Sequence, residues 1–153
     1  MIEIIKYQKQ HQIGINELLL SISLEFENGI YTKETEQTPL VPDVYWVALI
    51  NNDVIGTVGL SLVNNYAILK RMFLKKEYRG KNIGLSTKLL TKALTYCVNN
   101  NISSLYLGTM HQFKAGQRFY IKHGFERVVA DDLPRDFMLN PLDNMFFKKH
   151  IIT

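Results

Sequence analysis

The chain has 153 residues, of which 46% are hydrophobic and 21% charged, which is typical of one globular domain with its own core. Its net charge is +4, and Cys97 is its single cysteine, so an internal disulfide framework is excluded and a reducing compartment is favoured. No apolar run is long enough to cross a bilayer and the N-terminus lacks a secretory signal, so we expect a cytoplasmic single domain over residues 1–153 without a membrane partner.

The first half of the chain predicts a strand, a helix, a loop and three more strands. The run "IEIIKY" alternates as a strand does, and apolar residues from Ile13 to Phe26 then recur at helical spacing, with Gly29 near the end as a stop. Residues 30–43 contain two prolines and lack a clear period, which indicates a loop. Three β-rich runs follow, and asparagines in the short breaks between them favour tight hairpins; the runs are 44–50, 54–63 and 66–74.

The second half changes period. An apolar face from Ile83 to Val98 predicts a helix, which includes Cys97 on its buried side and ends at "NNN". A strand, a helix stopped by Gly124 and two more strands follow, at 103–109, 113–123, 125–130 and 145–151. This order predicts an α/β or α+β domain, in which a mixed central sheet has helices on both faces.

Charge is unevenly distributed along the chain. Residues 66–92 hold eight Lys or Arg residues against Glu77, whereas residues 25–43 hold five acids against Lys33. The basic segment favours a partner that carries phosphate, and the acidic segment favours a cation. Two solvated surfaces of opposite sign would give the same pattern.

The stretch "EYRGKNIG" joins the predicted strand 66–74 directly to the helix that follows it. The first N–H groups of a helix have no acceptor inside the helix, and the helix dipole favours an anion at that end. Gly80 and Gly84 would let backbone approach such an anion, Arg79 and Lys81 add positive charge, and Ser86 adds a hydroxyl. These residues predict a pyrophosphate site. The spacing is neither that of a Walker loop nor that of the dinucleotide fingerprint.

Two motifs resemble the GNAT family of acetyl-CoA-dependent N-acetyltransferases. The family's central motif is Arg or Gln, two residues, Gly, one residue, then Gly or Ala; Arg79 and Gly84 match its ends, and Asn82 replaces the middle glycine. The run "FYIKHGF" at 119–125 is similar to the family's "FYEKxGF". The resemblance covers about 45–128, and "LGT", "RFY", "GF" and "LP" resemble a bacterial subgroup whose substrates are largely unassigned.

The resemblance implies a GNAT-like fold with a splayed central strand pair and a site for acetyl-CoA as co-substrate. Backbone groups of Met72, Phe73 and Leu74 are expected to bind the pantetheine amides. The pyrophosphate is expected on Arg79, Gly80, Lys81, Asn82, Ile83, Gly84, Leu85 and Ser86. Phe113 stands where the family often has an asparagine, and we expect it to pack against pantetheine or adenine.

The resemblance also implies catalytic roles. The Tyr120 hydroxyl is expected to protonate the leaving thiolate, which suits a phenol that stays protonated at neutral pH. The glutamate that many relatives carry on the central strand is replaced by Ile68. His111 is therefore a candidate base, and an exposed loop histidine is the alternative. Glu25 and Glu27 border the expected acceptor site and are candidates for binding an ammonium group.

The predicted activity is direct attack of a primary amine on the acetyl thioester, with a backbone N–H near Met72 or Phe73 stabilising the oxyanion. Catalysis through a covalent acetyl-cysteine is disfavoured, and the histidines share no metal-ligand spacing with Cys97, so no metal is expected. Two alternatives stay open: a CoA-binding sensor with little catalysis, and a basic nucleic-acid-binding domain. The expected acceptor is a small-molecule or peptide amine, nucleic acid is not an expected partner, and a homodimer is left open.

Overall fold

The computed structural model describes residues 1–25, 41–80 and 82–151. The predicted helix stop at Gly29 and the candidates Glu27 and Lys81 lie outside these ranges. The chain divides into two compact units, here called unit 1 (residues 1–60 and 70–93) and unit 2 (residues 61–69 and 94–153). A single domain over residues 1–153 stays a prediction.

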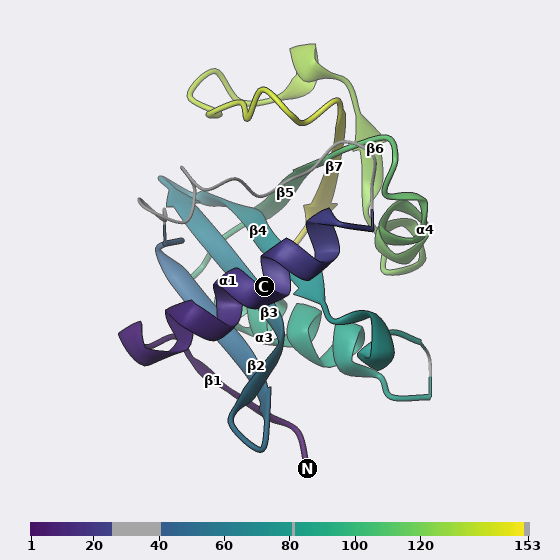
Figure 1. The fold of residues 1–153 in the computed structure, drawn as a ribbon. Helices are drawn as coiled ribbons and strands as arrows, with labels where there is room; N and C mark the ends of the chain where they lie inside the picture. Colours follow the sequence, from purple (N-terminus) through teal and green to yellow (C-terminus); the bar gives the residue numbers. More distant parts are fainter. Residues whose placement is uncertain (26–40, 81, 152–153) are drawn as a thin grey trace. The chain divides into compact units, whose positions relative to one another are not determined.

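The order of helices and strands is the predicted one (Figure 1). Short 3-10 turns at Lys9–His11, Lys76–Tyr78 and Ala130–Asp132 were not predicted. Among the described helices, none is long and apolar enough to span a membrane. The elements are β1 (Glu3–Lys6), α1 (Gln12–Ser23), β2 (Val44–Ile50), β3 (Asp53–Val63), β4 (Tyr66–Leu74), α3 (Leu85–Asn99), β5 (Ser104–Thr109), α4 (Lys114–Lys122), β6 (Glu126–Val128) and β7 (Met145–His150).

The strands form a mixed seven-stranded sheet in the order β1-β2-β3-β4-β5-β7-β6. The β4–β5 pair is parallel, with α3 as the crossover that a parallel pair needs, and β1–β2, β2–β3, β5–β7 and β7–β6 are antiparallel. β3 and β4 each contribute residues to both units. The predicted mixed sheet is therefore confirmed, with the last strand inserted between β5 and β6.

Unit 1 carries one helix on each face of its strands. Ile15 and Leu19 of α1 pack with Tyr45, Val47 and Leu49 of β2, and Figure 1 shows α1 lying across these strands. The register shift between Ala48 and Leu49 leaves Ile55 as an extra residue of β3, so Val54 pairs with Leu49 on the α1 face whereas Gly56 pairs with Ala48 on the other face. On the other face, a Cβ at Gly56 would lie 3.2 Å from Leu89 and 3.5 Å from Leu85 of α3.

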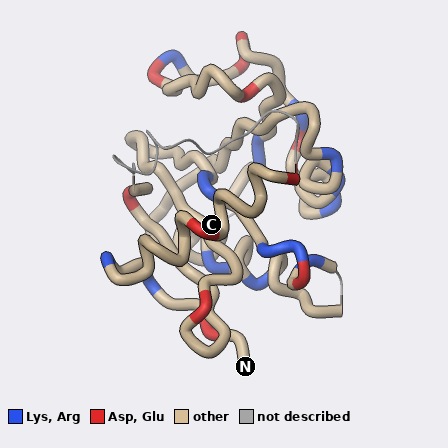
Figure 2. The backbone as a smooth tube through the Cα atoms, viewed as in Figure 1, with Lys and Arg blue, Asp and Glu red and all other residues tan. Residues whose placement is uncertain are grey.

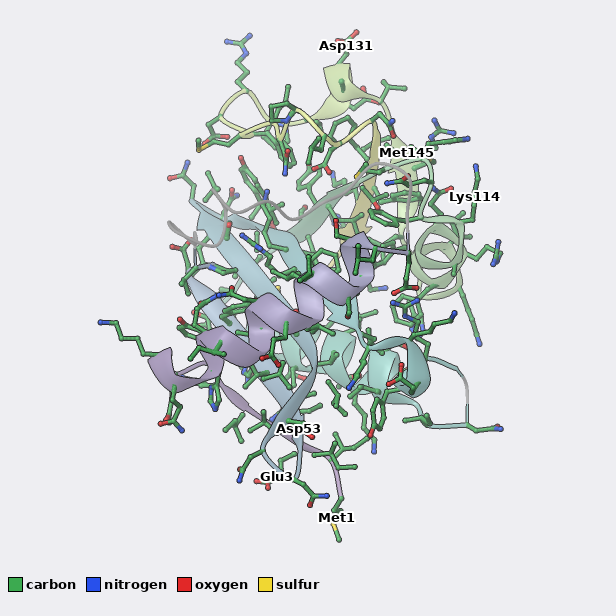
Figure 3. The ribbon with its side chains drawn as sticks, viewed as in Figure 1. Met1, Glu3, Asp53, Lys114, Asp131 and Met145 are labelled. Carbon is green, nitrogen blue, oxygen red and sulfur yellow. The ribbon has the colours of Figure 1, made fainter. Side chains whose placement is uncertain are left out.

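Unit 2 is centred on β7. Phe147 is fully buried opposite Leu107 of β5, and the Tyr120 ring of α4 lies 6.1 Å from the Phe147 ring. Figure 3 shows Met145 at the start of β7 and Lys114 at the start of α4. The strand predicted at 125–130 is shorter than expected, because Ala130 already begins a 3-10 turn.

The predicted turns and helix ends are mostly confirmed. Asn51 (φ 48°), Asn52 (φ 68°) and Asn64 (φ 52°) occupy the left-handed region in the two hairpins, as expected of Asn. Gly124 (φ 88°) follows α4. Two helix boundaries differ: α1 already ends at Ser23, before the predicted end near Phe26, and α3 begins at Leu85, so Ile83 precedes the helix.

We predict that replacing Leu89 of α3 by alanine lowers the free energy of unfolding by about 2–5 kcal/mol, because a fully buried leucine leaves a cavity that its neighbours fill only in part. Urea unfolding followed by circular dichroism measures this loss. The same change at Leu20 of α1, whose side chain is 49% exposed, is the control and is expected to cost about 0.5 kcal/mol or less. Equal losses in both variants would contradict the assignment of Leu89 to the core.

Cys97 of α3 is fully buried, and burial raises the pKa of its thiol to about 11. Very little thiolate therefore forms at pH 8, and the thiol is shielded as well. We expect a thiol-specific chromogenic reagent to label the native protein at least 100-fold more slowly than the urea-unfolded protein. Fast labelling of the native protein would show that Cys97 is accessible and reopen a covalent role.

Candidate active site

The β4 backbone leaves regular strand geometry at Arg71. Arg71 has φ 54°, in the left-handed region that a residue other than glycine adopts at a cost of about 1–3 kcal/mol. The buried Thr57 hydroxyl of β3 donates a hydrogen bond of 2.6 Å to the Arg71 carbonyl. The pairing register of β4 with β5 covers Tyr66–Leu69 and ends before this point. The irregularity lies where the family resemblance implies a bulged and splayed strand.

The three residues after Arg71 are the ones predicted to bind pantetheine. Phe73 packs against the core cluster of α1 and β2, which anchors this part of β4 in unit 1. The Lys75 N–H donates to the Ile55 carbonyl at 2.8 Å and ties the end of β4 to β3. Met72, Phe73 and Leu74 are thus partly buried and held from both sides, which suits a preformed backbone site.

Two glycines between β4 and α3 have left-handed backbone. Gly80 (φ 119°) and Gly84 (φ 69°) both have positive φ, and a Cβ on either would meet no atom within 4 Å. The Gly84 N–H donates to the Gly80 carbonyl at 3.4 Å, and the Gly84 carbonyl accepts from the Lys88 N–H at 3.1 Å as the helix begins. Exposed backbone therefore leads straight into the N-terminal turn of α3, whose N–H groups have no acceptor inside the helix. Such an arrangement can hold an anion.

Arg79, predicted to contact pyrophosphate, is engaged by a carboxylate. Its Nη1 and Nη2 donate to Glu25 Oε1 and Oε2 at 2.7 and 2.8 Å, and its Nε donates to the Leu74 carbonyl at 3.0 Å. The hydrogen bonds from Arg79 hold the pKa of Glu25 below its ordinary value. Glu25, predicted as an ammonium ligand, is therefore ionised and paired with the phosphate loop. Figure 2 shows Lys and Arg positions along the end of β4 and the turn after it.

Tyr120, the predicted general acid, is buried in unit 2. Its ring lies 5.6 Å from the Phe119 ring and 5.5 Å from the Phe125 ring, both in edge contact. Burial raises the pKa of its phenol well above that of an ordinary tyrosine. Tyr120 therefore keeps its proton across the whole physiological range, as a general acid requires.

His111, the candidate base, lies in the exposed loop before α4. Its ring Nε2 lies 2.7 Å from the ammonium Nζ of Lys114, so the nitrogen that accepts this contact is occupied. Its backbone N–H donates to Asn144 Oδ1 at 2.8 Å, and its carbonyl accepts from Gln117 Nε2 at 2.9 Å. These contacts describe an exposed, well-anchored loop histidine, which the sequence analysis kept as the alternative.

Ile68, the position at which the family resemblance implies a glutamate, is buried in an apolar cluster. Its neighbours there are Tyr66 and Tyr106, with Leu133 and Phe137 of the C-terminal loop packed against them. The Tyr66 hydroxyl donates to Asp136 Oδ1 at 2.8 Å, which ties the loop to β4. An ionised base is therefore absent from this position.

Two contacts within the units involve residues that the sequence did not single out: Thr57 binds the Arg71 carbonyl in unit 1, and Lys114 contacts His111 in unit 2. A threonine inside the apolar run "VIGTVGL" is a visible signal in the sequence. Phe113, predicted to contact the cofactor, is the N-cap residue of α4 and is half-buried. Among the described residues, no three His, Cys, Asp or Glu side chains gather in a way that could hold a metal ion.

Comparison with known proteins places these features in a family. A family model described as "Acetyltransferase (GNAT) family" matches residues 15–125. A crystal structure of a GNAT-family acetyltransferase from Staphylococcus aureus MU50 has a TM-score of 0.88 and 34% identity and covers 99% of this chain and 100% of its own. Streptothricin acetyltransferase A of Bacillus subtilis is 31% identical over 127 residues, which are 71% of this chain and 72% of that protein.

Other relatives are longer than the matched region. N-acetylaspartate synthetase of Danio rerio is 30% identical over 111 residues, which are 68% of this chain but 38% of that protein. The matches confirm the predicted class of activity, transfer of an acetyl group from acetyl-CoA to an amine. With its mixed sheet, its interrupted β4 and its glycine-lined loop before α3, this chain belongs to the acetyltransferase (GNAT) family.

Proposed function

We propose that the chain acetylates a primary amine by direct attack on acetyl-CoA, and that its residues take the roles predicted from sequence. The observation that carries this proposal is the loop 79–84, where Gly80 and Gly84 expose backbone ahead of α3 within a chain of this family. The pyrophosphate binds this loop and the first turn of α3, including Ser86. The pantetheine amides bind the backbone of Met72, Phe73 and Leu74.

The chemical step follows from these roles. A neutral amine attacks the thioester carbonyl, and a backbone N–H of Met72 or Phe73 stabilises the oxyanion. Collapse of the intermediate breaks the carbon–sulfur bond, and the Tyr120 hydroxyl protonates the thiolate. Its raised pKa keeps the phenol protonated until the intermediate collapses. Because Ile68 provides no carboxylate, we propose that the proton of the amine leaves through water, with His111 as the candidate base once Lys114 moves away.

The acceptor proposed here is a cationic amine. Spermidine N(1)-acetyltransferase of Thermoplasma acidophilum, whose named substrate is a polyamine, is 34% identical over 92 residues, which are 60% of this chain and 55% of that protein. Because Arg79 already neutralises Glu25, we assign that carboxylate to the phosphate loop rather than to acceptor binding. A cytoplasmic location and a homodimer are kept as parts of the proposal.

We predict that Gly84→Glu abolishes acetyl-CoA binding. The new carboxylate would stand at the N-terminal end of α3, where it takes the place of the pyrophosphate charge. Isothermal titration calorimetry with acetyl-CoA measures the loss, which we expect to exceed 100-fold in Kd.

The matched control for this variant is Gly84→Gln, which has nearly the same size and the same backbone cost at φ 69° but no charge. We expect Gly84→Gln to bind acetyl-CoA within about tenfold of the unmodified protein. Equal loss in both variants would assign the effect to backbone strain. Acetyl-CoA binding that survives Gly84→Glu would move the phosphate site elsewhere.

We predict that Tyr120→Phe lowers kcat by about 10²–10⁴-fold, because a positioned acid contributes rate enhancements of that size. KM for acetyl-CoA is expected to stay within about threefold, since the ring and its packing are retained. Release of free CoA thiol with spermidine as the trial acceptor measures both constants. Tyr96→Phe on α3, where the ring is only partly buried, is the control and should retain full activity.

The pH profile gives a second readout for Tyr120. Its folded-state pKa is raised, so the phenol loses its proton only above the ordinary tyrosine range, and Tyr120 should produce no alkaline fall in kcat below about pH 10. If the unmodified protein binds acetyl-CoA yet releases no thiol with any amine tested, the chain acts as a CoA-binding sensor.

A further inference from the structure

Thr57 is a polar residue in the most apolar stretch of unit 1. Its side chain is fully buried, between Gly56 and Val58 of β3 and opposite Val47 of β2. The buried polar side chains among the described residues are His11, Ser23 and Thr57. Packing alone does not account for the hydroxyl, because valine has nearly the same shape and would not bring a polar group into the core.

The Thr57 hydroxyl joins two groups that each need a partner. It has one proton, and this proton goes to the Arg71 carbonyl at 2.6 Å. The buried Tyr45 hydroxyl of β2 also interacts with the Thr57 side chain, and since the single Thr57 proton goes to Arg71, we assign Tyr45 as the donor to Thr57 Oγ1. Burial raises the pKa of Tyr45, so its hydroxyl keeps the proton that it donates. The chain of bonds runs from β2 through β3 to the irregular residue of β4.

Arg71, at the end of this series of hydrogen bonds, has a backbone conformation outside regular strand geometry. Arg71 has φ 54°, which arginine adopts only when its surroundings compensate the steric cost. A left-handed residue inside a strand turns the following peptide groups away from the direction that they would otherwise take. Those peptide groups belong to Met72, Phe73 and Leu74, the proposed pantetheine site.

We propose that Thr57 is a positioning residue for the cofactor: its hydroxyl holds Arg71 in the left-handed conformation and thereby aims the backbone of Met72–Leu74 at the pantetheine arm of acetyl-CoA. This inference rests on the proposed function. The pyrophosphate loop lies beyond the 3-10 turn at Lys76–Tyr78 and has its own backbone hydrogen bonds, so it does not depend on Thr57.

The test compares two ligands on three proteins. CoA contains pantetheine, whereas adenosine 3′,5′-bisphosphate lacks the pantetheine arm and reports the nucleotide end alone. Thr57→Val removes the hydroxyl and keeps the shape, and Thr57→Ser keeps the hydroxyl. Isothermal titration calorimetry gives Kd for each ligand with each protein, and circular dichroism confirms that each variant is folded.

We expect Thr57→Val to weaken CoA binding about tenfold and to leave the bisphosphate within twofold of the unmodified protein, the loss expected for one buried hydrogen bond. Thr57→Ser should bind CoA within about threefold of the unmodified protein. Equal weakening of both ligands would overturn the proposal and leave Thr57 a purely structural residue. Unchanged CoA binding in folded Thr57→Val would overturn it as well.

A second variant tests the proposal even if Thr57→Val does not fold. Tyr45→Phe removes the other end of the bond chain, and we expect a smaller loss of CoA affinity, about threefold, again without effect on the bisphosphate. Unchanged CoA binding in this variant together with an unfolded Thr57→Val would count against the proposal. Failure of the unmodified protein to bind CoA at all would instead defeat the proposed function.

Discussion

A strand that pairs in a sheet uses its backbone N–H and C=O groups for its neighbours, so it has none to offer a ligand unless its geometry changes along its length. β4 meets this constraint by changing at Arg71. Before that residue it pairs in parallel with β5 over Tyr66–Leu69, and at Arg71 the backbone enters the left-handed region. Contacts within unit 1 compensate the steric cost of this conformation. The Thr57 hydroxyl donates to the Arg71 carbonyl, and the Phe73 side chain packs against the core two residues further along the strand.

The proposed phosphate loop carries a balance of charges. Arg79 is held by both oxygens of Glu25, two residues after the end of α1, and this pairing orders the guanidinium. A partly exposed ion pair of this kind contributes only about 0.2–1 kcal/mol. A doubly charged pyrophosphate can therefore compete for Arg79 without a large penalty. Glu25 is best understood as a group that prepares the loop.

The absence of a carboxylate at Ile68 shapes the chemistry. Aromatic rings of β4, β5 and the C-terminal loop enclose this position, so an ionised group there would lose its solvation. In the proposed mechanism, proton removal from the amine falls to solvent or to His111, and Tyr120 is the proposed acid. The relatives with named substrates act on quite different amines, which fits a family in which the cofactor site is shared and the acceptor site varies.

Local sequence determined most of what a single strand, helix or turn can decide. Sequence patterns located every strand and α-helix among the described residues, but not the 3-10 turns. Asn51, Asn52 and Asn64 marked the hairpins, and Gly80 and Gly84 marked the exposed backbone before α3, because each of these features depends on neighbours a few residues away. The two family motifs added the acetyl-CoA chemistry that periodicity alone does not contain.

The sequence analysis did not anticipate that Thr57, 14 residues from Arg71, would support its backbone, or that Glu25, 54 residues from Arg79, would occupy its guanidinium. Nor did it foresee the insertion of β7 between β5 and β6. Only the tertiary structure decided these features, because hydrogen bonds and strand neighbours between distant residues leave no period in the sequence.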